Sequence, residues 1–171
     1  MKTLLAAAAI LLISMTGNAQ TTQPDIGTND RGELVYNGLT TFDDLEQEES
    51  FTWLTEGAAT YQPNGEKILY LLEKLPLYDM VVVMGTWCED SHNMIPKLYK
   101  VLTEVEYPME KLKMYGVDRE KHSKTGEHEK YKVTNVPVVI LLKDGKEAGR
   151  ITELVKKSVE ADLADIIAND K

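Results

Sequence analysis

The chain has 171 residues and a formal net charge of −9, with 28 acidic against 19 basic residues. Nucleic acids and anionic membranes are polyanions, and the sequence has no basic cluster that would offset their repulsion, which argues against both as partners. The length suits one domain with a single hydrophobic core.

The first residues have the pattern of an export signal. Lys2 supplies a positive start, the stretch from Leu4 to Ile13 is continuously apolar, and Gly17-Asn18-Ala19 offers small residues before a cleavage site. Such an apolar run is too short to span a bilayer, which takes about 20 residues, so we expect no membrane insertion. The sequence predicts a signal peptide over 1–19 and an exported protein, either periplasmic or secreted.

The segment that follows is mostly polar. Residues 20–31 contain almost nothing apolar, which predicts a flexible leader ahead of a single domain over 32–171. Residues 32–62 are expected to form an N-terminal helical extension, in which Thr41 is a candidate cap. Apolar residues then recur at helical spacing over 68–75, which predicts a helix that Pro76 ends.

The single cysteine lies between two apolar elements. The expected strand over 78–84 is continuously apolar from Met80 to Met84, as in a central strand covered on both faces. Residues 93–105 have helical spacing interrupted by Pro96, which predicts a kinked helix. Cys88 therefore lies at a strand-to-helix junction, where free backbone N–H groups stabilise a thiolate. It is a candidate nucleophile.

The C-terminal half completes an alternating pattern. We expect strands over 112–117 and 138–142, a polar segment with a helix over 123–132, and a hairpin at Asp144-Gly145 into a strand over 147–152. A closing amphipathic helix is capped by Ser158. Strands separated by helices imply parallel crossovers, so the predicted fold class is α/β, with a central mixed sheet of about four to five strands flanked by helices.

Several motifs together resemble the thioredoxin superfamily. They are the apolar strand, Trp87-Cys88-x-x-Ser91, the helix proline Pro96, and Val136-Pro137 before the next strand. The resemblance covers about residues 66–168 and implies a thioredoxin-like fold. Residues 116–119 (Gly-Val-Asp-Arg) and 149–151 (Gly-Arg-Ile) also look like exported thioredoxin-like proteins of the Bacteroidetes type.

The resemblance implies roles for named residues. Pro137 is expected to take a cis peptide bond beside Cys88, and Trp87, Val136 and Pro137 to shape a substrate groove. Ser91 stands where a dithiol enzyme has its resolving cysteine. Because the chain has one cysteine, any disulfide must be intermolecular.

Four neighbours bear on the reactivity of Cys88. Ser91 can donate a hydrogen bond to the thiolate, whereas the carboxylates of Glu89 and Asp90 oppose its formation by like-charge repulsion. His92, one turn along the helix, could act as an ion-pair partner or acid if it faces the sulfur. Many dithiol relatives carry a buried acid six residues before the nucleophile, and this chain has Val82 there.

Two functions remain open at this point. A single nucleophilic cysteine can form mixed disulfides with protein or small-molecule thiols and disulfides, glutathione among them, which predicts thiol–disulfide exchange in cell redox homeostasis, as an oxidoreductase or isomerase. The alternative is a non-enzymatic thioredoxin-fold module that binds a protein. No cofactor or metal is expected, since Cys88 and His92 alone do not complete a tetrahedral zinc site. The sequence leaves the oligomeric state open.

Overall fold

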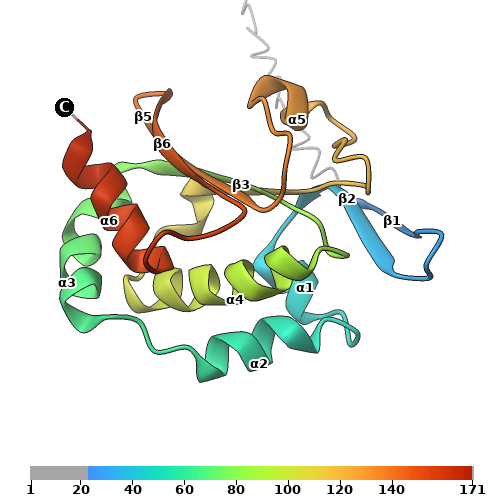
Figure 1. The fold of residues 1–171 in the computed structure, drawn as a ribbon, viewed down its shortest axis with the longest axis horizontal. Coiled ribbons are helices and arrows are strands. Elements are labelled where there is room, and N and C mark those ends of the chain that lie inside the picture. The colour runs from blue at the N-terminus through green and yellow to red at the C-terminus, as the bar shows by residue number, and fades with distance from the viewer. Residues whose placement is uncertain (1–22, 171) are drawn as a thin grey trace, which may run out of the picture.

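A computed structural model describes residues 23–170 (Figure 1). The predicted signal peptide over 1–19 and the start of the predicted leader lie outside the described residues. No helix in the described range is both long enough and apolar enough to cross a membrane.

The centre of the fold is a six-stranded mixed sheet in the order β1-β2-β4-β3-β5-β6. Strands β3 and β4 are parallel, and every other neighbouring pair is antiparallel. The strands are β1 Asp25–Thr28, β2 Leu34–Thr40, β3 Asp79–Met84, β4 Leu112–Gly116, β5 Val138–Lys143 and β6 Lys146–Thr152. The α/β class and the mixed sheet are confirmed, with one more strand than the highest predicted count.

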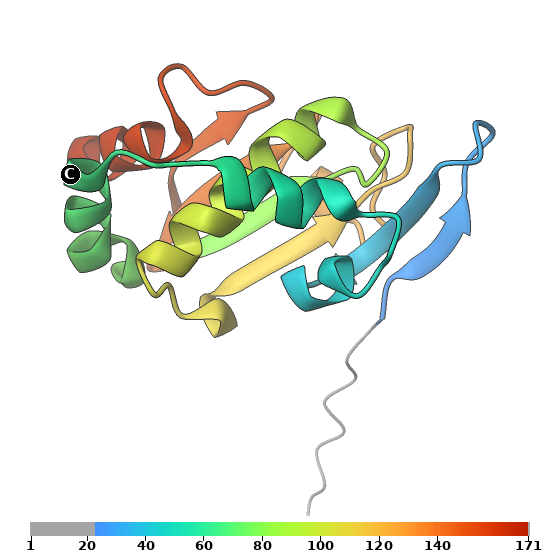
Figure 2. The ribbon, with the colours of Figure 1, turned by 90° about the horizontal axis from the view of Figure 1, so that it is seen from below.

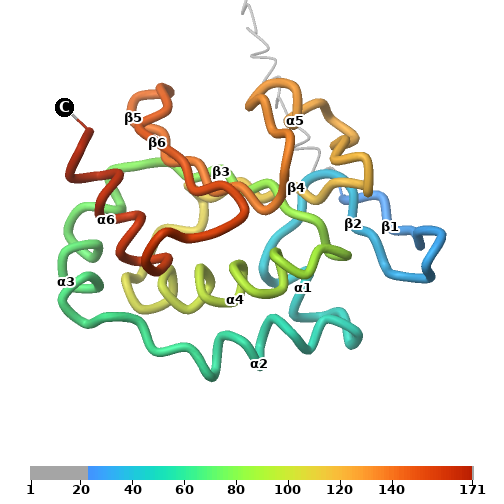
Figure 3. Tube along the Cα trace, in the orientation of Figure 1, coloured from blue at the N-terminus to red at the C-terminus, as the bar shows by residue number. Residues whose placement is uncertain are grey.

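Strands β1 and β2 correct the N-terminal prediction. Residues 25–28, expected to be part of a flexible leader, pair with β2 residues 34–37. The turn between them is held by Asn29, whose side-chain oxygen accepts from the backbone N–H groups of Arg31 and Glu33 at 3.0 Å. Every residue of β1 is exposed, so apolar content gave no sign of this strand. In Figure 3 the hairpin lies at the opposite end of the molecule from α3 and α6.

Most helices cover one face of the sheet. Figure 1 shows α2, α3, α4 and α6 on one side and the short α5 on the other, and Figure 2 shows α2 lying across α4. Gly57 permits this contact, because a Cβ there would lie 2.7 Å from the ring of Pro96. The helices are α1 Phe42–Glu46, α2 Thr52–Thr60, α3 Gly65–Lys74, α4 Glu89–Glu104, α5 Glu127–Lys130 and α6 Val159–Asn169, with 3-10 turns Leu75–Leu77 and Met109–Lys111.

Two of the helix starts follow the predicted caps. Thr41 and Asp44 form a reciprocal capping box at α1, and the Ser158 hydroxyl accepts from Ala161 N at 3.4 Å at α6. The predicted hairpin at Asp144 and Gly145 is also present, with both residues at positive φ.

Hydrophobic side chains fill both faces of the sheet. The larger cluster joins Met80, Val82 and Met84 of β3 to α4 and α6, and the smaller one joins Val81 and Val83 of β3 to residues of β5. Strand β3 is thus buried on both faces, as its continuous apolar sequence predicts.

A buried carboxylate ties α6 to the connection between α2 and α3. Glu160 is 2% exposed, accepts from the Tyr61 hydroxyl at 2.6 Å, and accepts from Asn64 N at 3.1 Å. Burial opposes ionisation of Glu160, but these hydrogen bonds outweigh it and hold the pKa of the carboxyl below its ordinary value of 4.5. The folded state therefore favours the ionised form.

Substituting Glu160→Gln is expected to lower the free energy of unfolding at pH 7 by about 2 kcal/mol, the scale of hydrogen bonds to a charged group. Because the folded pKa is lower than the unfolded one, the contribution is fully present above about pH 5 and is lost as the pH falls below about 4. Urea unfolding at pH 7 and at pH 3.5 checks both statements. Glu56→Gln, on the exposed face of α2, is the matched control, and an equal loss in the two variants would contradict the role of Glu160.

Candidate functional site

Cys88 occupies the position that the sequence predicts, at the start of the 16-residue helix α4. It is the N-cap residue, with extended backbone angles of φ −94° and ψ 122°, and its carbonyl accepts the first helical hydrogen bond, from His92 N at 3.0 Å. The turn that delivers it from β3 is closed by a hydrogen bond from Cys88 N to Gly85 O. The half-buried sulfur thus lies where unpaired helical N–H groups gather.

The cysteine thiol contacts the segment that precedes β5. Its Sγ donates to Val136 O across 3.5 Å, and the Val136–Pro137 peptide bond is cis, as the resemblance implies. The contact arises because β5 pairs with β3 in antiparallel register, with Val138 opposite Val83. A carbonyl oxygen can only accept, so this hydrogen bond belongs to the protonated thiol.

Trp87 is held in a defined orientation beside Cys88. Its Nε1 donates to Val117 O at 2.9 Å, and the Arg119 guanidinium lies 5.0 Å from the ring centroid. The ring also covers Gly85, where a Cβ would come within 2.7 Å of the indole. Glycine at 85 therefore permits this position of the ring.

Ser91 has a different partner from the predicted one. The side chain is fully buried, and its hydroxyl oxygen accepts from Gly85 N at 3.3 Å. No hydrogen bond joins Ser91 to Cys88 in the part of the chain that the structure describes. In this geometry Ser91 stabilises the turn that carries the cysteine.

His92 is also directed away from the sulfur. Its Nε2 lies 2.6 Å from Thr86 O, and its ring stacks on Trp53 with centroids 4.5 Å apart and planes 19° apart. The carbonyl must accept, so Nε2 carries a hydrogen. Within the described residues, no hydrogen bond joins His92 to Cys88.

The two acidic neighbours remain free of cations. Glu89 is exposed and Asp90 is half-buried in the first turn of α4. Neither takes part in a salt bridge within residues 23–170. Their charges are therefore not neutralised by a direct contact.

Thr86 and Trp53 belong to the site but were not among its predicted residues. The buried Thr86 hydroxyl accepts from Tyr36 N at 3.2 Å and donates to Leu34 O at 2.7 Å, which ties the cysteine turn to β2. Both partners are about 50 residues away along the chain, so no local pattern indicates them. The contact of Trp53 with His92 depends on how α2 packs against α4, which no pattern near Cys88 indicates.

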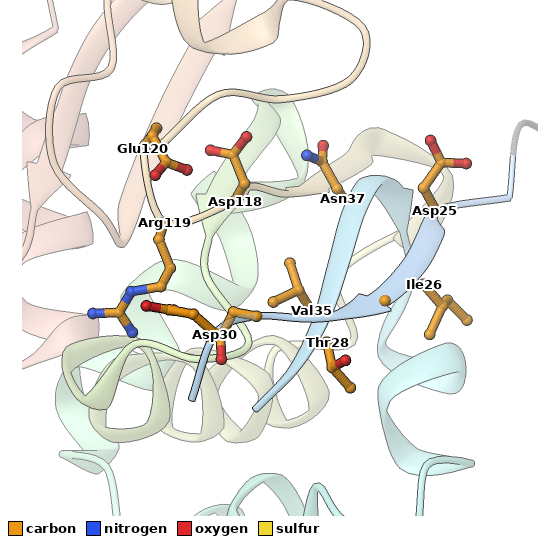
Figure 4. A pocket seen from close by; sticks show the side chains of 11 residues that line it. Asp25, Ile26, Thr28, Asp30, Val35, Asn37, Asp118, Arg119 and Glu120 are labelled. Atoms are coloured by element: carbon orange, nitrogen blue, oxygen red, sulfur yellow. The ribbon is translucent and has the colours of Figure 1, made fainter. Parts of the chain in front are cut away.

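A separate cavity of about 480 Å³ lies at the β1–β2 hairpin (Figure 4). Asp25, Asp30, Asp118 and Glu120 line it, but Figure 4 shows their carboxylates spread around the hairpin and not directed at one point. Within the described range, no group of three or more His, Cys, Asp or Glu side chains is placed to hold a metal ion.

Comparison with known families decides the identity of this fold. A family model described as thioredoxin matches residues 76–169. The chain belongs to the thioredoxin family. The match begins just before β3 and contains Trp87, Cys88, Ser91, Val136 and Pro137. Strands β1 and β2 and helices α1, α2 and α3 lie outside it.

Similar solved structures include two thioredoxins. Thioredoxin from Fasciola hepatica is 24% identical, with a TM-score of 0.39, over 62% of this chain and 90% of that one. Oxidised mitochondrial thioredoxin 3 from Saccharomyces cerevisiae is 19% identical, with a TM-score of 0.38, over 66% and 98%. A Pseudomonas aeruginosa protein of unknown function is 12% identical, with a TM-score of 0.53, over 78% and 84%, and shares the fold. A search of curated proteins finds no match.

Proposed function

We propose that this thioredoxin-family protein catalyses thiol–disulfide exchange, with Cys88 as its single nucleophile. The observation that carries the proposal is the position of Sγ, at the N-terminus of α4 and 3.5 Å from the carbonyl that precedes the cis Pro137. A helix N-terminus favours the thiolate, the nucleophilic form of cysteine.

The chemistry is a balanced exchange of one disulfide for another. The Cys88 thiolate attacks one sulfur of a substrate disulfide, so that the Cys88–substrate S–S bond forms while the original S–S bond breaks. The departing sulfur takes the electron pair as a thiolate and is then protonated from solvent. Because the chain has no second cysteine, an external thiol must attack the mixed disulfide to release Cys88.

The carbonyl oxygen of Val136 acts both before and after Cys88 ionises. Before ionisation its carbonyl oxygen accepts the thiol hydrogen. Ionisation removes that donor and leaves the oxygen free to accept a backbone N–H from an extended substrate, in the manner of an added strand. Trp87 and Pro137 flank the sulfur in this arrangement and shape the substrate groove.

A second candidate function is a non-enzymatic protein-binding module. It is favoured by the surroundings of Sγ, because the one hydrogen bond that Cys88 Sγ makes within the described residues requires the protonated thiol. Ser91 and His92, the predicted stabilising groups, are engaged with Gly85 and Thr86. In this function the thiol stays protonated and the groove serves binding alone.

Reaction with disulfides separates the two functions. Mature protein is incubated at pH 7 with 2-hydroxyethyl disulfide, an uncharged probe, and intact mass is followed over time. Exchange predicts a single adduct on Cys88 that forms faster than on a free cysteine derivative under the same conditions. A rate at or below that of the free thiol would favour the binding module.

We further propose that the protein acts outside the cytoplasm, as a monothiol member of the exported thioredoxin-like proteins that it resembles. The support is the sequence pattern over 1–19, which has the charge, apolar run and small residues of an export signal. The intact mass of protein recovered from a periplasmic or culture fraction tests this. Retention of residues 1–19 on a cytoplasmic protein would contradict it.

A further inference from the structure

A groove with aromatic walls lies beside the cysteine turn. It has a volume of about 480 Å³, and its lining includes Glu33, Glu48, Trp53, Trp87 and His92. We call the groove that these five residues line the aromatic groove. Trp87 and His92 bracket Cys88 along the chain, whereas the other three lie outside the family match over 76–169. The groove is therefore a feature that the N-terminal part of this chain adds to the thioredoxin domain.

One wall of the aromatic groove already holds a cation. The Arg119 guanidinium lies 5.0 Å from the Trp87 ring and donates to Glu33 at 3.0 Å. An indole face and a carboxylate together bind a guanidinium through its charge and its hydrogen bonds. The contact of Arg119 thus shows that an indole and a carboxylate in this groove bind a guanidinium group.

On the other wall a second carboxylate and a second indole line the groove, and no cation is paired with either within the described residues. Glu48 and Trp53 both line the groove, and Glu48 makes no salt bridge in the described part of the chain. The backbone N–H and the hydroxyl of Ser50 donate to Glu48 at 3.1 and 2.8 Å, which lowers the pKa of this carboxyl and keeps it charged.

The two charged residues that directly follow Cys88 in the sequence are both acidic. Glu89 and Asp90 directly follow Cys88, and Arg119, the cation at the groove, is paired with Glu33. These carboxylates therefore favour a disulfide that carries a positive charge. Surface potentials of one sign change association rates by about 10- to 1,000-fold and weaken as salt screens them.

We infer that Cys88 selects disulfides that carry a positive charge near the reacting sulfur, such as a lysine or arginine beside a substrate cysteine. The cation binds at the second wall of the aromatic groove, between the carboxylate of Glu48 and the indole of Trp53. Anionic disulfides, oxidised glutathione included, react more slowly. This inference rests on the proposed exchange function and names its substrate class.

Three small disulfides of different charge test the selection. They are cystamine, which is dicationic, 2-hydroxyethyl disulfide, which is neutral, and dithiodipropionate, which is dianionic. Second-order rate constants for adduct formation are measured by intact mass, and each is divided by the rate of a free cysteine derivative with the same probe. We expect the normalised rate of the cationic probe to exceed that of the anionic probe at least about tenfold at low salt, and the ratio to shrink as salt is raised.

Variants locate the effect in the groove. Glu48→Gln and Trp53→Phe are each expected to bring the rate of the cationic probe down toward that of the neutral one. Glu66→Gln, an exposed acid on α3, is the control of equal charge change and should leave all three rates as they are. Thermal unfolding of each variant confirms that it is folded.

The outcomes separate the inference from the proposed function. Equal normalised rates for the three probes overturn the selection and leave exchange standing. A preference for cystamine that survives both groove variants assigns it to net charge and overturns the groove as its cause. Failure to react even with the neutral probe overturns exchange itself, and the selection with it.

Discussion

Replacing Cys88 with serine is expected to abolish mixed-disulfide formation to below detection. The chain has one cysteine, and a serine hydroxyl does not attack disulfides at neutral pH, so no other side chain can substitute. Serine is close in size to cysteine, and its hydroxyl can still donate to Val136 O, so we expect the free energy of unfolding to change by less than about 1 kcal/mol. Intact mass after incubation with an aromatic disulfide measures the reaction, and urea unfolding measures the stability.

The reciprocal variant Ser91→Cys adds a thiol on the next turn of α4. We expect it to form an internal disulfide with Cys88 on oxidation and to reduce insulin disulfides, which the wild-type monothiol does not do efficiently. The buried position of Ser91 gives the new thiol a fixed place beside the cysteine turn. Adducts on the Cys88→Ser protein would contradict the role of Cys88 as the single nucleophile. In the Ser91→Cys protein, thiols at 88 and 91 that fail to pair would contradict the proposed geometry.

The largest effect on stability is expected for Gly116→Ala. A Cβ at Gly116 would lie 2.0 Å from Tyr36 O and 2.8 Å from Tyr36 C. Both are backbone atoms and cannot rotate away, so β2 would have to separate from β4, where Gly38 faces Gly116. We expect a loss of about 3 kcal/mol. For a chain of this size, that loss corresponds to a fall of roughly 10 °C in the melting temperature.

Gly27→Ala is the matched control for this variant. It makes the same chemical change in exposed strand β1, where a Cβ would meet no atom within 4 Å. We expect a change within about 0.5 kcal/mol, as for most surface substitutions. Thermal and urea unfolding of the two variants, followed by circular dichroism, gives the comparison. Equal losses of stability in the two variants would show that β2 can separate from β4 at Gly116 with little cost in free energy.

The elements that the sequence predicts well are those whose signal is local. Strand β3 is continuously apolar, and α1 and α6 begin at Thr41 and Ser158, whose side chains form the predicted caps. Strands β1 and β2 lack such a signal. Strand β1 buries nothing, and β2 is defined by its pairing with β4, more than 70 residues further along the chain.

The difference between local signals and long-range packing also explains which parts of the candidate site the sequence predicts. The positions of Cys88, Val136 and Pro137 follow from the family pattern and from the pairing of β3 with β5. Helical spacing places His92 one turn from Cys88, but the direction of its side chain is decided by Thr86 O and by Trp53. Trp53 arrives from α2, and the packing of one helix on another is not encoded in the cysteine motif.

The aromatic groove gives this protein an intrinsic optical reporter. The chain contains two tryptophans, Trp53 and Trp87, and both line that groove. Thiols, disulfides and cationic groups quench indole emission at short range. Tryptophan fluorescence of the unlabelled protein therefore originates entirely from the aromatic groove, so binding of a substrate there can be followed in real time without a dye or an added residue.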